Sequence, residues 1–117
     1  MTQHNSLPPF IFLYGPPGSG KSTLARRLAQ ALKLPCLELD QEIERLAGAA
    51  IPDIFAQAGE AVFRQMEKRA LQEALARPGA VIALGGGALL DDDCRQMAEA
   101  AGKVVCLSAS FETLWQR

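Results

Sequence analysis

The sequence predicts an α/β fold in which a parallel β-sheet is covered by helices. Short apolar runs alternate along the chain with segments of helical periodicity, and this alternation favours strand–helix–strand units. A glycine-rich loop joins the first apolar run to the first helical segment. The length of 117 residues fits a single domain. We therefore expect four parallel strands with helices between them.

The first half of the chain predicts two strands, at residues 10–14 and 36–39. The helix between them ends before Pro35, because the residue before a proline disfavours helical geometry. Asp40 is well placed to cap the next helix, and Gly48 ends that helix. The apolar stripes expected to face the core are Leu24, Leu28, Ala31 and Leu32 in the first helix, and Ile43, Leu46 and Ala47 in the second.

The second half predicts a long helix, two more strands and a surface helix. A short helical turn is expected after Pro52 and is closed by Gly59. The longer helix that follows has Phe63, Met66, Ala70 and Ala74 on its inward side. Asp91, Asp92 and Asp93 are interpreted as a helix start, which favours negative charge, rather than as a metal site. The expected ranges are 60–76 for the long helix, 80–84 for a central strand, 91–101 for the surface helix and 103–107 for the fourth strand.

Composition limits the classes of partner. The formal net charge is −1 and no face is obviously basic, so nucleic acid is not expected as a partner. No apolar run approaches the roughly 18–20 residues that span a bilayer. Cys36, Cys94 and Cys106 are odd in number and lack C-x-x-C spacing, so they are expected to be buried free thiols. A cytoplasmic monomer is the expected form.

The two ends of the chain differ from the rest. Residues 1–9 lack the order of a signal peptide and are expected to form a flexible tail, so the domain comprises residues 10–117. Residues 108–110 predict the start of another helix, which reaches under two turns before Arg117. Because so short a helix is unstable alone, we expect a longer protein to continue beyond this point.

The loop after the first strand has the sequence of a phosphate-binding loop, G-x-x-x-x-G-K-[ST]. Lys21 is expected to contact the β- and γ-phosphates, and the Ser22 hydroxyl to ligate Mg²⁺. The helix that begins near Lys21 adds its positive end to the same anion. The motif predicts a nucleoside triphosphate site and a three-layer P-loop NTPase fold. Its residues are Gly15, Pro16, Pro17, Gly18, Ser19, Gly20, Lys21, Ser22 and Thr23.

A second set of polar groups is expected at the same edge of the sheet, because open parallel sheets bind ligands beyond the carboxyl ends of their strands. Glu38 and Asp40 follow the second strand, and three glycines, Gly85, Gly86 and Gly87, follow the third. On the polar face of the long helix, Arg64 lies three residues before Glu67 and four before Lys68. A guanidinium opposite a carboxylate and bare amides suits a small polyhydroxy acid.

These segments resemble shikimate kinases in order and spacing. The matching blocks are the phosphate loop, Leu37 to Asp40, Ile51 to Glu60 with Phe63 to Glu67, and Leu84 to Ala88. The resemblance covers residues 10–117, and the I-x-D-I-F…G-E…F-R-x-x-E block is far more specific than the phosphate loop. It implies ATP-dependent phosphorylation of the 3-hydroxyl of shikimate, with ATP and Mg²⁺ as cofactors, in the biosynthesis of aromatic amino acids.

The resemblance also implies roles for single residues. Asp40 would bind the acceptor hydroxyls and take a proton, and Arg64 would bind the shikimate carboxylate with Glu67 orienting it. Gly86 and Gly87 would offer backbone amides, and Glu38 would assist Mg²⁺ through water. Glu38 stands where the family has Asp. The family's lid arginine, adenine loop and fifth strand lie beyond Arg117, so the 117-residue chain alone is expected to be inactive or weak.

Several alternatives stay open. Asp40 could serve only as a helix cap, Arg64 and Glu67 could form an ordinary solvated ion pair, and Gly85 to Gly87 could form only a tight turn. The acceptor could be another small hydroxy acid, such as gluconate. The domain could also be a non-catalytic module of a regulator that binds such an acid without phosphorylating it.

Overall fold

The computed structural model describes residues 9–16, 20–85 and 88–107. The tail at residues 1–8 and the helix expected after residue 107 lie outside this part. Strands and helices alternate as expected. In chain order they are β1 (Phe10–Tyr14), α1 (Lys21–Leu32), β2 (Cys36–Glu38), α2 (Leu39–Ala47), α3 (Ile51–Ala74), β3 (Ala80–Ala83), the 3₁₀ turn η1 (Ala88–Leu90), α4 (Asp92–Ala101) and β4 (Gly102–Cys106).

The four described strands form one parallel sheet in the order β2-β3-β1-β4. The apolar strand β3 lies between β2 and β1, which confirms its expected central place. Side chains alternate between the two faces of the sheet. Phe10 and Phe12 of β1 face one hydrophobic core, and Ile11 and Leu13 face the other.

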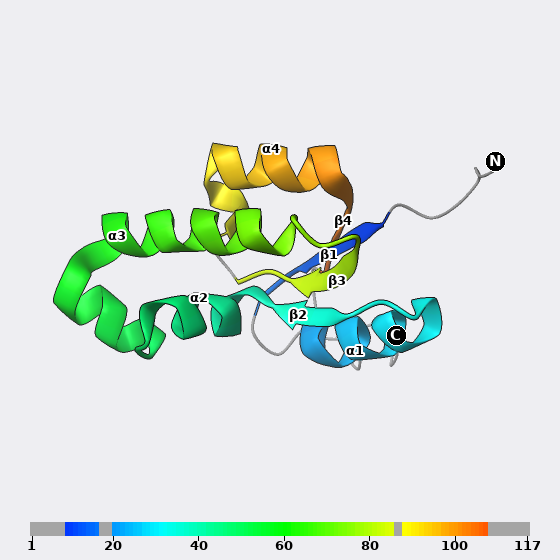
Figure 1. Cartoon of the computed structure of the whole chain (residues 1–117), viewed down its shortest axis with the longest axis horizontal. Coiled ribbons are helices and arrows are strands. Elements are labelled where there is room, and N and C mark those ends of the chain that lie inside the picture. Colours follow the sequence, from blue (N-terminus) through cyan, green and yellow to red (C-terminus); the bar gives the residue numbers. More distant parts are fainter. Residues whose placement is uncertain (1–8, 17–19, 86–87, 108–117) are drawn as a thin grey trace.

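Helices cover both faces of this sheet and complete three layers. Helix α1 packs on one face, through Ala25 and Ala29 against Ile11 and Leu13. Helices α3 and α4 lie on the opposite face, together with the inner side of α2 (Figure 1). The α/β fold with a parallel sheet is therefore confirmed.

The inward stripe of α1 differs from the expectation at one position. Ala25 and Ala29 are buried, with Leu24, Leu28 and Leu32 packed beside them. Ala31 is exposed, so its expected core position was wrong. Alanines at positions four apart let α1 lie close to the sheet, and Ala31 falls outside the stripe that they define.

Helix α2 begins two residues earlier than expected, at Leu39. Leu39 and Ile43, four residues apart, are both buried, so the helical period already includes Leu39. Glu38 occupies the cap position, without a side-chain cap hydrogen bond, and Asp40 lies within the first turn. The expectation that Asp40 caps this helix was therefore wrong.

Helix α3 consists of two helical segments that meet at Gly59. This glycine has φ 87° and ψ 172°, a conformation that essentially only glycine adopts, so the expected break is confirmed. The first segment begins with Ile51 and the second extends to Ala74. Phe63, Ala70 and Ala74 are buried as expected, and Met66 is partly buried.

The cysteines differ in exposure more than expected. All three are free thiols, and Cys94 is buried, whereas Cys36 is partly buried and Cys106 is exposed. The expectation of a buried thiol was wrong for Cys106, which ends the edge strand β4. Within the described part of the chain, no helix has the length and apolar character needed to cross a membrane.

Candidate active site

Lys21 lies where the two central strands end. It is the first residue of α1, after Gly20 in the left-handed conformation with φ 84°. Its Nζ donates hydrogen bonds to the carbonyl oxygen of Leu84 at 2.7 Å and to that of Gly15 at 3.3 Å. The ammonium group is thus held beside the ends of β1 and β3, at the N-terminus of a helix. This arrangement suits an anion at the same place. Pro17, Gly18 and Ser19 of the loop lie outside the described residues.

Ser22 and Glu38 bring two oxygen groups together beside Lys21. The Ser22 hydroxyl donates a hydrogen bond to Glu38 Oε1 at 2.9 Å, joining α1 to the end of β2. Gln41 contacts the other carboxylate oxygen at 3.5 Å. A hydroxyl and a carboxylate are the oxygen ligands that Mg²⁺ favours, so these two residues fit the ion. The neighbouring Thr23 is exposed.

Asp40 projects from the first turn of α2 toward Gly85. A Cβ atom added to Gly85 would lie 2.5 Å from Asp40 Oδ1, so Asp40 closely approaches the backbone of Gly85. Burial raises the pKa of Asp40, the charge of Lys21 opposes this shift, and the carboxylates of Glu44 and Glu38 add to it. Asp40 is therefore within electrostatic reach of Lys21. A carboxylate with a raised pKa is better matched to accepting a proton near neutral pH.

Arg64 and Glu67 form an ion pair of 2.9 Å between Nη1 and Oε1 on the second segment of α3. Glu67 is only 1% exposed, whereas the Arg64 side chain is 28% exposed, so the expectation that Glu67 lies on a polar face was wrong. Burial raises the pKa of Glu67, and the hydrogen bond from Arg64 opposes the shift. Asp40 also raises the pKa of Glu67, which places this pair within electrostatic reach of Asp40.

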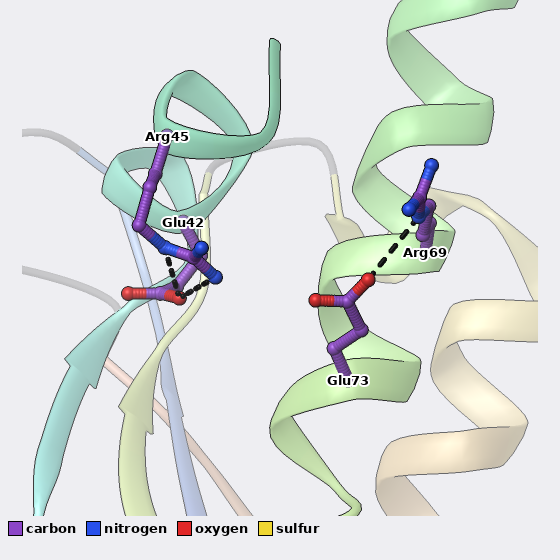
Figure 2. A network of polar contacts seen from close by, with 4 residues as sticks. All are labelled: Glu42, Arg45, Arg69 and Glu73. Atoms are coloured by element: carbon purple, nitrogen blue, oxygen red, sulfur yellow. Dashed lines mark hydrogen bonds and ion pairs between the residues drawn. The ribbon is translucent and has the colours of Figure 1, made fainter. Parts of the chain in front are cut away.

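The Arg64–Glu67 pair differs from the ion pairs at the helix surfaces. Figure 2 shows two of these, Glu42–Arg45 on α2 and Arg69–Glu73 on α3. In those pairs the arginine side chains are 61% and 70% exposed, respectively. Such pairs contribute little to stability. The buried Glu67 instead holds the partly exposed guanidinium of Arg64 in place. Lys68, expected on the same face, contacts Asp93 of α4 at 2.7 Å.

The structure adds an aromatic contact that the sequence analysis missed. The rings of Phe55 and Phe63 stack with their centroids 4.6 Å apart, and the Arg64 guanidinium carbon lies 5.3 Å from the centre of the Phe63 ring. Phe55 is 39% exposed, which makes it the one exposed large hydrophobic residue in the described part of the chain. The sequence carried no clear signal for this contact, because single apolar residues are common on protein surfaces.

The described site residues therefore gather at the carboxyl ends of the strands. Lys21, Ser22, Glu38, Asp40 and Gly85 are neighbours through direct contacts or close approach, whereas the Arg64–Glu67 pair is related to them only by the effect of the Asp40 charge on the pKa of Glu67. Gly86 and Gly87 lie outside the described residues.

The three aspartates after η1 lie at the start of α4. Asp91 Oδ1 accepts hydrogen bonds from the amides of Asp93 and Cys94, which confirms the expected helix start. No group of three potential metal ligands among His, Cys, Asp and Glu occurs in the described part of the chain.

Comparisons with known proteins agree with this arrangement. The family model "Shikimate kinase" matches residues 17–117. A shikimate kinase of Pseudomonas paraeruginosa is 50% identical over 102 residues, which are 87% of this chain and 59% of that protein. A shikimate kinase of Thermus thermophilus is 44% identical over 108 residues, which are 92% of this chain and 59% of that protein.

A solved structure of shikimate kinase from Acinetobacter baumannii, in complex with shikimate, aligns with a TM-score of 0.84. It is 43% identical, and the alignment covers 96% of this chain and 62% of that one. The chain thus spans about three fifths of the length of the relatives it matches. Together with the position of Lys21 and the parallel sheet, these matches show that the chain belongs to the shikimate kinase family.

Proposed function

We propose that the protein transfers the terminal phosphoryl group of ATP to the 3-hydroxyl of shikimate. One observation carries this proposal: Lys21 and Asp40 lie at the same rim. Lys21 contacts the carbonyl oxygen of Leu84, and the next residue, Gly85, is the one that Asp40 approaches. A phosphate group beside Lys21 and a hydroxyl beside Asp40 would therefore be neighbours. Shikimate kinases use ATP with Mg²⁺, and one solved relative binds shikimate.

The nucleotide side of the site is assigned to the phosphate loop and α1. Lys21 exchanges its carbonyl partners for phosphate oxygens, and the backbone N–H groups of the loop, which Pro16 and Pro17 lack, surround the phosphates. Ser22 and Glu38 would hold Mg²⁺, which neutralises charge on the phosphate groups when bound. Phosphoryl transfer depends on positioning and charge neutralisation more than on covalent chemistry, and this set of residues supplies both.

The acceptor side is assigned to α2, α3 and the glycines after β3. Arg64, oriented by Glu67, binds the carboxylate of shikimate through its two-pronged guanidinium. Asp40 accepts hydrogen bonds from the acceptor hydroxyls and takes the proton as the new bond to phosphorus forms. Gly86 and Gly87 offer backbone amides to the acid. We also propose that the protein acts as a monomer in the cytoplasm, in the biosynthesis of aromatic amino acids. Its three free thiols support a reducing compartment such as the cytoplasm.

Ligand-induced stabilisation tests the acceptor. A ligand that binds only the folded state at 100 times its Kd raises the free energy of unfolding by about 2.7 kcal/mol. We expect shikimate to raise the melting temperature, gluconate to leave it unchanged, and Arg64→Ala to remove the shikimate effect. Larger stabilisation by gluconate would favour the other hydroxy-acid kinase and contradict this proposal.

A coupled assay tests turnover separately from binding. For the 117-residue chain we expect slow turnover at best, since it spans about three fifths of the length of its relatives. Ordinary turnover by this chain would contradict that expectation. Shikimate binding by a longer protein that carries the lid arginine but shows no turnover would favour the regulatory module.

A further inference from the structure

Glu44 holds both sides of the turn between α2 and α3. Its carboxylate Oε2 accepts a hydrogen bond from the Ile51 amide at 2.8 Å, across seven residues of chain. Its backbone carbonyl accepts a second bond, from the Gly48 amide, at 2.8 Å. Gly48 is in the left-handed conformation with φ 68°, which ends α2 and turns the chain toward α3. One residue therefore closes the end of one helix and the start of the next.

The start of α3 needs an acceptor from elsewhere. The first amides of any helix lack partners within the helix, and a neighbouring side chain usually caps them. Here the cap position is Ala50, which offers no side-chain acceptor, and Pro52 has no amide hydrogen. Glu44 supplies the missing acceptor from α2, and its negative charge is favoured at the positive end of α3.

Contacts lead from this cap to the proposed acceptor pocket. The first segment of α3 extends from Ile51 to the break at Gly59 and carries Phe55. Phe55 stacks on Phe63, and Phe63 lies under the guanidinium of Arg64. On its other side, Glu44 lies one helical turn after Asp40 in α2. Glu44 therefore lies between the two helical segments that carry the groups assigned to the hydroxyls and to the carboxylate.

We propose that Glu44 is a positioning residue for the acceptor pocket: by capping the first segment of α3 from α2, it fixes the Phe55–Phe63–Arg64 stack relative to Asp40. This inference rests on the proposed function. None of the interactions described for Glu44 involves the phosphate loop. We therefore expect Glu44 to affect the binding of the acid and not the binding of the nucleotide.

Three variants of the 117-residue chain test the proposal, each titrated calorimetrically with shikimate and with ADP. Glu44→Ala removes the cap and is expected to weaken shikimate binding about fivefold or more, with ADP binding changed less than about twofold. Glu44→Gln keeps an oxygen that can accept from Ile51 and is expected to restore shikimate affinity. Glu42→Ala is the matched control on the same helix, because Glu42 pairs with Arg45 within α2 (Figure 2) and is expected to leave both affinities unchanged.

Amide hydrogen exchange at Ile51 gives a second measurement, one that requires no ligand. We expect faster exchange in Glu44→Ala and near-normal exchange in Glu44→Gln. Unchanged shikimate affinity in Glu44→Ala, or an equal loss in the Ala and Gln variants, would overturn the inference alone. Equal weakening of shikimate and ADP would also overturn it, because it would show a general structural role. If the unaltered chain binds ADP but not shikimate, the proposed function itself fails.

Discussion

At the scale of single residues, the site geometry leaves little room for a side chain at Gly85. An alanine Cβ would lie 2.5 Å from Asp40 Oδ1, so the Asp40 carboxylate would have to rotate away. We expect Gly85→Ala to lower the free energy of unfolding by about 0.5–1.5 kcal/mol, the cost of a displaced side-chain rotamer, measured in urea. In an Asp40→Ala background the same change should cost much less, because the group that it meets is gone. An equal cost in both backgrounds would mean that Asp40 does not approach Gly85.

Asp40 itself should make stability depend on pH. Because its folded-state pKa is raised above the ordinary value of 3.8, the folded protein favours the protonated carboxyl. The stability that this group contributes is full below about pH 3.8 and is lost as the pH rises through the folded-state pKa. Asp40→Asn should therefore be more stable than the unaltered chain at pH 7, and the difference should vanish near pH 3. Urea unfolding at both pH values measures this difference in the free energy of unfolding. An Asp40→Asn variant that is less stable than the unaltered chain at pH 7 would contradict the expected direction of the pKa shift.

At the scale of helices and strands, the break in α3 decides how the acceptor pocket is shaped. Gly59 has open space where a Cβ would lie, so the cost of a side chain there is purely conformational. With φ 87° and ψ 172°, Gly59→Ala should lower the free energy of unfolding by about 1–3 kcal/mol.

Gly48 provides the matched comparison, because it also has positive φ and open space but lies in the left-handed helical region. Asparagine tolerates that region, so Gly48→Asn should leave the free energy of unfolding nearly unchanged. Gly59→Asn should lower it as much as Gly59→Ala does. Chemical denaturation of the three variants gives the order of their stabilities. A Gly59→Asn variant as stable as Gly48→Asn would contradict the described break.

The elements could be predicted from sequence where apolar periodicity and glycines agree, as at the break of α3 and the apolar strand β3. They could not where two patterns compete. Leu39 fits both the end of a strand and the first inward position of a helix, and burial beside Ile43 decided for the helix. Because α2 begins at Leu39, Asp40 lies in the first turn of the helix and not at its cap position.

The candidate site shows the same limit. Spacing placed Arg64 and Glu67 on one side of a helix, but only tertiary packing shows that Glu67 is buried. The Glu44–Ile51 bond could not be predicted either, because it depends on how α2 and α3 meet.

For the molecule as a whole, the reaction rates of the cysteine thiols distinguish local exposure from global unfolding. Cys94 is fully buried in the core between α4 and the sheet, and burial with nearby carboxylates raises its pKa to about 11. Cys106 is exposed at the end of β4. Because only an exposed thiolate reacts, Cys94 should react with a thiol reagent on the order of 10³-fold more slowly than Cys106 in the folded protein.

Ligand binding should then protect one cysteine and not the other. If Cys94 reacts only through global unfolding, shikimate at 100 times its Kd should slow its modification about 100-fold, because binding depletes the unfolded state by that factor. Cys106 should react at the same rate with and without ligand, since its exposure requires no unfolding. Mass spectrometry of a Cys36→Ser variant follows the two sites together. Equal protection of both cysteines would mean that shikimate covers β4 directly, and protection of neither would mean that the acid does not bind the folded chain.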